Sequence, residues 1–205
     1  YLKQFEDENT VAKQTMPAPA QMLSELQRAD NIETTRRIYP DLEKLIHDIA
    51  KAYRTVIREL YDAGCRNIQF DDCTWGMIVD SGYWEKKVGK GVSINEEAEK
   101  FIRINNLALE GKPEDMVINT HVCRGNYQST YAASGAYDPI APYQFRKENA
   151  NAFYLEYDDK RSGGFEPLRY VTGDKKAVLG LITTKSPALE NKDTVIARIH
   201  EAEKY

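Results

Sequence analysis

Helical segments alternate with short apolar segments along most of the chain, and this alternation limits the folds that it can adopt. From residue 40 onward, a helical pattern followed by a strand-like run occurs four times, with strands predicted at 65–72, 116–122, 151–158 and 177–184. Repeated helix–strand order with short connections builds a parallel sheet covered by helices. We therefore predict an α/β fold, with one earlier candidate strand near residues 11–19.

The clearest helix is predicted over residues 41–63, where apolar side chains recur at steps of three and four. Asp41 opens this segment and Gly64 closes it, as helix ends commonly require. Three further helices are predicted: one from about Asn95 to Gly111, one over residues 142–150 and one from about Asn191.

Polar residues follow the predicted strands where each one ends. These are Asp71 and Asp72, His121 and Cys123, Glu156 and Asp158, and Thr184 and Lys185. An eight-stranded (β/α) TIM barrel carries its chemistry at this end of its strands. The sequence has no glycine-rich turn of the GxGxxG or GxxxxGK[ST] kind, which disfavours a nucleotide-binding doubly wound sheet. We therefore favour a barrel, although 205 residues are fewer than the roughly 250 of a closed one.

His121 and Cys123 stand two residues apart, so their side chains leave the same face of a strand. Zinc accepts imidazole, thiolate and carboxylate ligands, and a thiolate favours zinc over magnesium or calcium. Glu156, which ends the next predicted strand, is the candidate carboxylate. The pattern predicts a zinc site, while the plainer interpretation makes Cys123 a core residue and His121 a hydrogen-bonded strand-end residue. Cys65 and Cys73 are both predicted to be structural.

Three further side chains are candidates for substrate binding. Asp71, which shares a face with Gln69, would hold a substrate ammonium or else cap the strand end. Lys185 would bind an anionic group or sit solvated in its turn. Arg124 would clamp a carboxylate, or its tyrosine-rich loop would only pack over the barrel rim.

A long loop is predicted after Asp72. Trp75 and Trp84 lie in it, where they would stack on a planar cofactor or, more ordinarily, pack beneath the loop.

Charge and composition narrow the class of partner. The net charge of −4 disfavours a nucleic-acid or anionic-membrane surface, so small-molecule substrates are expected. No apolar run approaches the roughly 18 residues of a membrane span, and three cysteines are too few for a disulfide scaffold. We expect a cytoplasmic protein with reduced thiols.

Four segments, IQFDD, INTHVCRGN, FYLEYDD and VLGLITTKSP, together resemble the carboxy-terminal catalytic barrel of cobalamin-independent methionine synthases. They are more similar still to shorter, single-barrel bacterial methyltetrahydropteroyltriglutamate-homocysteine methyltransferase-like proteins. The resemblance covers most of the chain from about residue 40. It implies a zinc ion held by His121, Cys123, Glu156 and a second cysteine, with Asp71 binding the amino group of homocysteine.

The resemblance also implies a reaction. A methyl group would move from 5-methyltetrahydrofolate, as its polyglutamate, to a zinc-activated thiol, with homocysteine giving methionine. Lys185 stands where full-length methionine synthases carry a histidine proposed as the proton donor, so the catalytic acid is not identified.

The same comparison implies a single catalytic barrel domain over residues 1–205, truncated at both ends and holding about strands 3 to 7. The fourth zinc ligand is then expected beyond Tyr205. The sequence leaves three alternatives open. The first is a zinc-thiol alkyl transferase with another acceptor, and the second is a barrel glycoside hydrolase that uses Asp71 or Asp72 with Glu156. The third is an inactive fragment whose open barrel exposes its edge strands.

Overall fold

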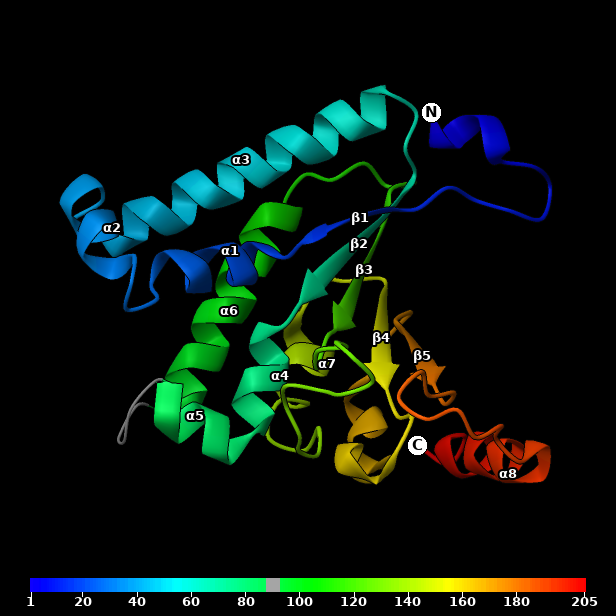
Figure 1. Ribbon diagram of the computed structural model, residues 1–205. Helices are drawn as coiled ribbons and strands as arrows, with labels where there is room; N and C mark the ends of the chain where they lie inside the picture. Colours follow the sequence, from blue (N-terminus) through cyan, green and yellow to red (C-terminus); the bar gives the residue numbers. More distant parts are fainter. Residues whose placement is uncertain (88–92) are drawn as a thin grey trace.

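The computed structural model describes residues 1–87 and 93–205, and a parallel sheet of five strands forms its centre (Figure 1). The strands pair side by side in chain order: β1 (Gln14–Pro17), β2 (Asn67–Asp72), β3 (Val117–Val122), β4 (Ala152–Glu156) and β5 (Lys176–Gly180). The predicted α/β fold with a parallel sheet is confirmed. A doubly wound sheet reverses its strand order at a switch point, and these five strands show no reversal.

Helices separate the strands along the chain. The α-helices are α1 (Pro19–Leu26), α2 (Ile32–Ile38), α3 (Leu42–Asp62), α4 (Thr74–Val79), α5 (Ser81–Lys87), α6 (Ile94–Leu109), α7 (Gln144–Lys147) and α8 (Lys192–Ala202). Three short 3-10 helices are η1 (Leu2–Phe5), η2 (Lys160–Ser162) and η3 (Glu166–Tyr170). None of the helices among the described residues is long and apolar enough to cross a membrane.

The three long helices begin where the sequence predicts. The side chains of Asp41, Ser93 and Asn191 each accept a hydrogen bond from a backbone N–H in the first turn of α3, α6 and α8. Beyond α3 and α6, Gly64 and Gly111 adopt φ angles of +95° and +69°, which a residue with a side chain adopts only under strain. The predicted starts and glycine ends are confirmed.

Two predictions about connections are wrong. The fourth strand ends at Gly180 and not at residue 184, so Thr184 and Lys185 lie in the turn beyond it. The loop predicted after Asp72 contains α4 and α5, while residues 88–92 lie outside the described residues.

The two faces of the sheet differ in burial. Alternate residues of β2, β3 and β4, such as Ile68, Ile118 and Phe153, are fully buried, while their neighbours on the other face are mostly half-buried. In Figure 1, α3 and α6 run beside the strands, and the two helices pack against each other. The half-buried face carries the polar strand ends named above.

The half-buried face is concave. Lys13, just before β1, places its Nζ 3.2 Å from the side-chain oxygen of Gln69 and 3.9 Å from the ring centre of Tyr154 in β4. In a flat sheet the backbones of β1 and β4 would lie about 14 Å apart, and side chains perpendicular to the sheet would not meet across that span. The sheet therefore curves around this face.

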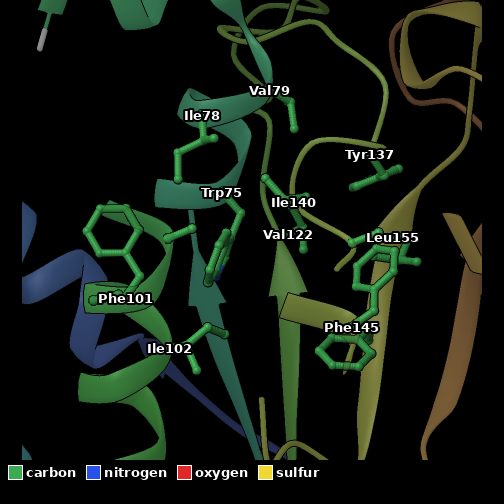
Figure 2. Packing of buried hydrophobic residues seen from close by; sticks show 14 of the residues in the cluster. Trp75, Ile78, Val79, Phe101, Ile102, Val122, Tyr137, Ile140, Phe145 and Leu155 are labelled. Atoms are coloured by element: carbon green, nitrogen blue, oxygen red, sulfur yellow. The ribbon is translucent and has the colours of Figure 1, made fainter. Parts of the chain in front are cut away.

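Aromatic and aliphatic side chains fill the space between strands and helices (Figure 2). Trp75 of α4 is fully buried and meets Phe101 of α6 edge to face, with ring centres 5.8 Å apart. Trp84 is also buried. Both tryptophans are therefore core residues, in agreement with the packing interpretation and not with cofactor stacking.

A buried polar network ties the helix layer to the strand ends. The Asn105 amide nitrogen in α6 donates to Asp72 at 3.0 Å and to Glu148 at 3.4 Å, and the Asn105 side-chain oxygen accepts from the Ala20 N–H. Thr120 of β3 donates to the same Glu148 oxygen at 2.6 Å. The carboxyl groups of Asp72 and Glu148 thus lie together in a fully buried site, where burial makes their charged forms energetically costly.

This network predicts a pH dependence of stability. Burial, and then the charge of Asp72, raise the pKa of Glu148 from 4.5 to about 7. The unfolded chain loses this proton near pH 4.5, so the stabilisation is complete below that pH and is lost as the pH rises through 7. From pH 5 to 8, the free energy of unfolding should fall by up to about 3 kcal/mol through this group.

Glu148→Gln should abolish most of that fall, which urea unfolding at pH 5, 6.5 and 8 measures. Glu59→Gln, at an exposed position of α3, is the matched control and should keep the fall. An unchanged slope in Glu148→Gln would contradict the assignment.

Candidate metal centre

His121, Cys123 and Glu156 converge on the concave face at the ends of β3 and β4. One ligand atom of each, namely a His nitrogen, the Cys sulfur and a carboxylate oxygen, lies within 4.8 Å of the other two. The strand register explains this convergence, because His121 pairs with Tyr154 and both Cys123 and Glu156 lie two residues further on. The structure thus brings together the three residues predicted as ligands.

A backbone carbonyl orients the His121 ring. Its Nδ1 lies 3.1 Å from the carbonyl oxygen of Tyr154, which requires a proton on Nδ1. Nε2 then carries the free lone pair and faces Glu156, 3.7 Å from its Oε1. A histidine whose Nδ1–H donates to a carbonyl oxygen is prepared to ligate a metal through Nε2.

The surroundings of His121 raise its pKa. Burial acts most strongly and lowers the pKa of His121, but hydrogen bonds with Cys123 and Tyr154 and the negative charges of Cys123 and Glu156 together raise it above its ordinary value. A group of negative partners that favours a proton on Nε2 equally favours a metal cation there.

Cys123 is poised as a thiolate. The thiol of Cys73, which hydrogen-bonds to the Cys123 sulfur, is the main cause that lowers the pKa of Cys123, and the hydrogen bond with His121 follows. The Gly125 N–H also approaches the sulfur, at 3.4 Å. The pKa of Cys73 is raised in turn, chiefly by the same contact.

Two hydrogen bonds hold the main chain of Glu156 in place. Its N–H donates to the Tyr137 hydroxyl at 2.9 Å, and its carbonyl oxygen accepts from the Ser162 hydroxyl. Tyr137 and Ser162 are fully buried. The end of β4 is therefore fixed by one residue that precedes β4 in the chain and one from η2, which follows it.

The carboxylate of Glu156 is also held. Oε2 accepts from Arg161 at 2.7 Å and lies 3.7 Å from Lys185, while Oε1 accepts from the backbone N–H of Arg124 at 3.1 Å. Since Arg161 occupies one oxygen, the other is directed toward His121.

Arg161 is the centre of a wider ion cluster. Its side chain is 3% exposed and pairs with Asp158 at 2.8 Å and with Asp159, beside its contact with Glu156. Burial raises the pKa of Asp158, but hydrogen bonds from Lys185, Thr183 and Arg161 outweigh it, so that the pKa is lowered overall. The Asp158 carboxylate is therefore charged near neutral pH.

The two adjacent aspartates face opposite ways, as predicted. Asp71 lies on the concave face, where it pairs in register with His121 and accepts from Gln69 at 2.9 Å. Asp72 is fully buried on the helix side, with Thr74 and Asn105 as partners. Of these two aspartates, Asp71 is therefore the one that can reach a ligand at the candidate centre.

The Arg124 side chain agrees with the loop-packing interpretation. Its side chain is 1% exposed, donates to the carbonyl oxygen of Gly135 and lies over the ring of Tyr137 at 4.2 Å. In this position the guanidinium group of Arg124 is not accessible to a substrate carboxylate. The backbone N–H of Arg124 contributes to the site through its hydrogen bond to Glu156. Tyr127 and Tyr131 of the same loop are exposed.

Lys185 is also engaged and not freely solvated. Its Nζ lies 3.1 Å from Asp158 and its side chain is 12% exposed. Thr184 lies at the rim, where its hydroxyl accepts from Asn126 at 2.8 Å.

Three residues of the centre were not predicted as part of it. Arg161 stands in a charged loop that looks solvated, and Tyr137 stands in a loop of several tyrosines, so neither carries a distinguishing pattern. Cys73 was predicted to be structural. Its one available signal was its position one residue past a strand end, matching that of Cys123.

The donor set suits zinc. An imidazole nitrogen with a fixed tautomer, a sulfur favoured as thiolate and a carboxylate oxygen are the ligand types of catalytic zinc sites with three protein ligands. The thiolate argues against magnesium and calcium, which prefer oxygen.

Comparison with known families gives an independent description. The model of the family described as "Cobalamin-independent synthase, Catalytic domain" matches residues 34–205. All the residues of the candidate centre lie inside this range.

Three proteins are similar to this chain over most of its length. The Bacillus subtilis proteins YxjG and YxjH, both described as uncharacterized, are 43% and 41% identical over 80% and 96% of this chain. A solved structure from Listeria monocytogenes, described provisionally as a vitamin-B12 independent methionine synthase, is 35% identical with a TM-score of 0.72 over 97% of this chain. The chain spans 44%, 51% and 54% of these three proteins, about half of their lengths.

A more distant relative carries an activity in its name. The methionine synthase of Pyrococcus abyssi is 26% identical over 82% of this chain, which spans 40% of that protein.

The contact of α4 with Cys123 yields a stability prediction. A Cβ at Gly76 would lie 2.5 Å from the carbonyl oxygen of Cys123, so Gly76→Ala must push helix and strand apart. Such overpacking should cost about 1–3 kcal/mol. Gly82→Ala, in α5, is the matched control, because its Cβ would meet nothing closer than 3.5 Å. Urea unfolding measures both variants, and an unchanged Gly76→Ala would contradict the close packing.

Proposed function

The chain belongs to the cobalamin-independent synthase catalytic-domain family, and we propose on that premise that it is part of a zinc-dependent methyltransferase. The methyl donor is 5-methyltetrahydrofolate as its polyglutamate, and the acceptor is a thiol, homocysteine, which becomes methionine. The convergence of His121, Cys123 and Glu156 within 4.8 Å is the observation that carries the proposal.

The ligands in this proposal are Nε2 of His121, Sγ of Cys123 and Oε1 of Glu156. Zinc held there would lower the pKa of a coordinated substrate thiol, so that it reacts as a thiolate near neutral pH. Arg161 keeps Glu156 from turning away, and the Tyr154 carbonyl keeps the His121 ring in its metal-binding tautomer.

Two charged side chains beside the ligands have roles in binding the substrates. Asp71, adjacent to His121 on the concave face, would hold the ammonium group of the amino acid and so aim its sulfur at the ligands. Lys185, at the rim, would meet an anionic group of a substrate. A methyl group bound to the nitrogen of a folate is a poor electrophile, so this nitrogen must be protonated as it leaves.

We further propose that the five strands are a segment of the (β/α) barrel of this family, as part of a single catalytic domain. The sequential parallel order and the curvature shown by the contact of Lys13 with Tyr154 support this. A related transferase that uses another acceptor thiol is compatible with the same site. A glycoside hydrolase that uses Asp71 or Asp72 with Glu156 is not favoured, because it gives no role to His121 and Cys123 beside Glu156. Asp72 also lies on the opposite face, and Glu156 is bound to Arg161.

Zinc binding is the first test. The chain, freed of metal and then incubated with zinc and desalted, should retain about one equivalent by elemental analysis. Cys123→Ala should lose it, since the thiolate is the strongest of the three ligands. Cys65→Ala, which removes a cysteine next to Asn67 at the other end of β2, should retain it. A wild-type chain that refuses zinc would sink the proposal.

Arg161 supplies a second test. Arg161→Met keeps much of the side-chain volume but releases Glu156, so zinc affinity measured by competition with a chelating dye should fall about 10- to 100-fold. Arg58→Met, at an exposed position of α3, should leave the affinity unchanged. Equal affinities of Arg161→Met and wild type would show that Glu156 needs no such support.

A further inference from the structure

Cys73 and Cys123 lie next to each other at the ends of neighbouring strands. In the parallel pairing of β2 with β3, Asp71 is opposite His121 and Asp72 is opposite Val122. Cys73 directly follows Asp72, and Cys123 directly follows Val122. Adjacent strands are about 4.8 Å apart, which falls inside the range of about 4.4–6.8 Å between the Cα atoms of a disulfide.

The turn after β2 keeps the two thiols together. Cys73 is the N-cap residue of α4, and Gly76 in the first turn of that helix packs directly on the carbonyl group of Cys123. Both side chains are half-buried, and neither cysteine is in a disulfide. Cys65 precedes β2, at the opposite end of that strand, and its sulfur lies 3.4 Å from the Asn67 carbonyl oxygen.

We propose that Cys73 and Cys123 are a redox-active pair that closes to an intramolecular disulfide when the protein meets a peroxide. One thiol attacks the peroxide oxygen and becomes a sulfenic acid while water leaves. The second sulfur then attacks the sulfenic sulfur, forms the S–S bond and releases another water. Two thiols lose two electrons and two protons, and hydrogen peroxide is reduced to two waters.

The disulfide would have a consequence for the metal centre. A sulfur in a disulfide is no longer a thiolate, so oxidation removes Cys123 from the ligand set and leaves His121 and Glu156. This consequence, and not the disulfide itself, rests on the proposed function. Bound zinc should conversely protect the pair, because the ion occupies the Cys123 sulfur.

The test counts thiols in the chain after treatment with a small excess of hydrogen peroxide. Metal-free protein should fall from three thiols to one under denaturing conditions, with a mass lower by two hydrogens. Peptide mapping should find one linked pair of peptides, containing Cys73 and Cys123. Prior loading with zinc should slow the reaction at least several-fold.

The matched variants separate this pair from other chemistry. Cys65→Ser should form the same disulfide, and Cys73→Ser should instead accumulate a sulfenic acid at Cys123, trapped with dimedone. A wild-type chain that keeps three thiols, or that links Cys65, would overturn the proposal. If the disulfide forms but zinc never binds, the proposed function fails while this inference stands, and zinc binding without a disulfide gives the opposite result.

Discussion

The in-register pairing of β2, β3 and β4 places Asp71, His121 and Glu156 on one face of the sheet. Side chains alternate along a strand, so a slip of one residue would turn His121 and Cys123 into the helix layer and expose Thr120 and Val122 instead. Burial of the alternate side chains against α3 and α6 opposes such a slip. The hydrophobic layer therefore sets the geometry of the polar face.

The adjacent aspartates show how closely the two layers are coupled. Asp71 serves the concave face, while Asp72, one residue on, enters the dry network with Asn105 and Glu148. That network joins α6 to the ends of β2 and β3 and to the end of α7. A carboxylate in such a site is stable only with all its partners, so the network penalises alternative packings as well as holding the native one.

The elements predicted from the sequence are those with a local signal. The stripe of α3 and the polar caps of α3, α6 and α8 can be recognised within one stretch of chain, and so can the apolar runs of β2, β3 and β4. Helices α1, α2, α4 and α5 have at most eight residues each, too few for a clear stripe. The ligand candidates lie at strand ends, whereas Arg161 and Tyr137 join the centre from connecting segments whose paths depend on tertiary contacts.

Charge around Glu156 gives a physical reason for a cation at this site. Glu156, Asp158 and Asp159 face two cations, Arg161 and Lys185, which leaves one negative charge unbalanced. Arg161 and Lys185 approach Oε2 of Glu156, so the unbalanced charge is most accessible at Oε1, on the side of His121. The thiolate form of Cys123 adds a second negative charge there, and a divalent cation would neutralise both in a half-buried position where two unpaired anions are costly.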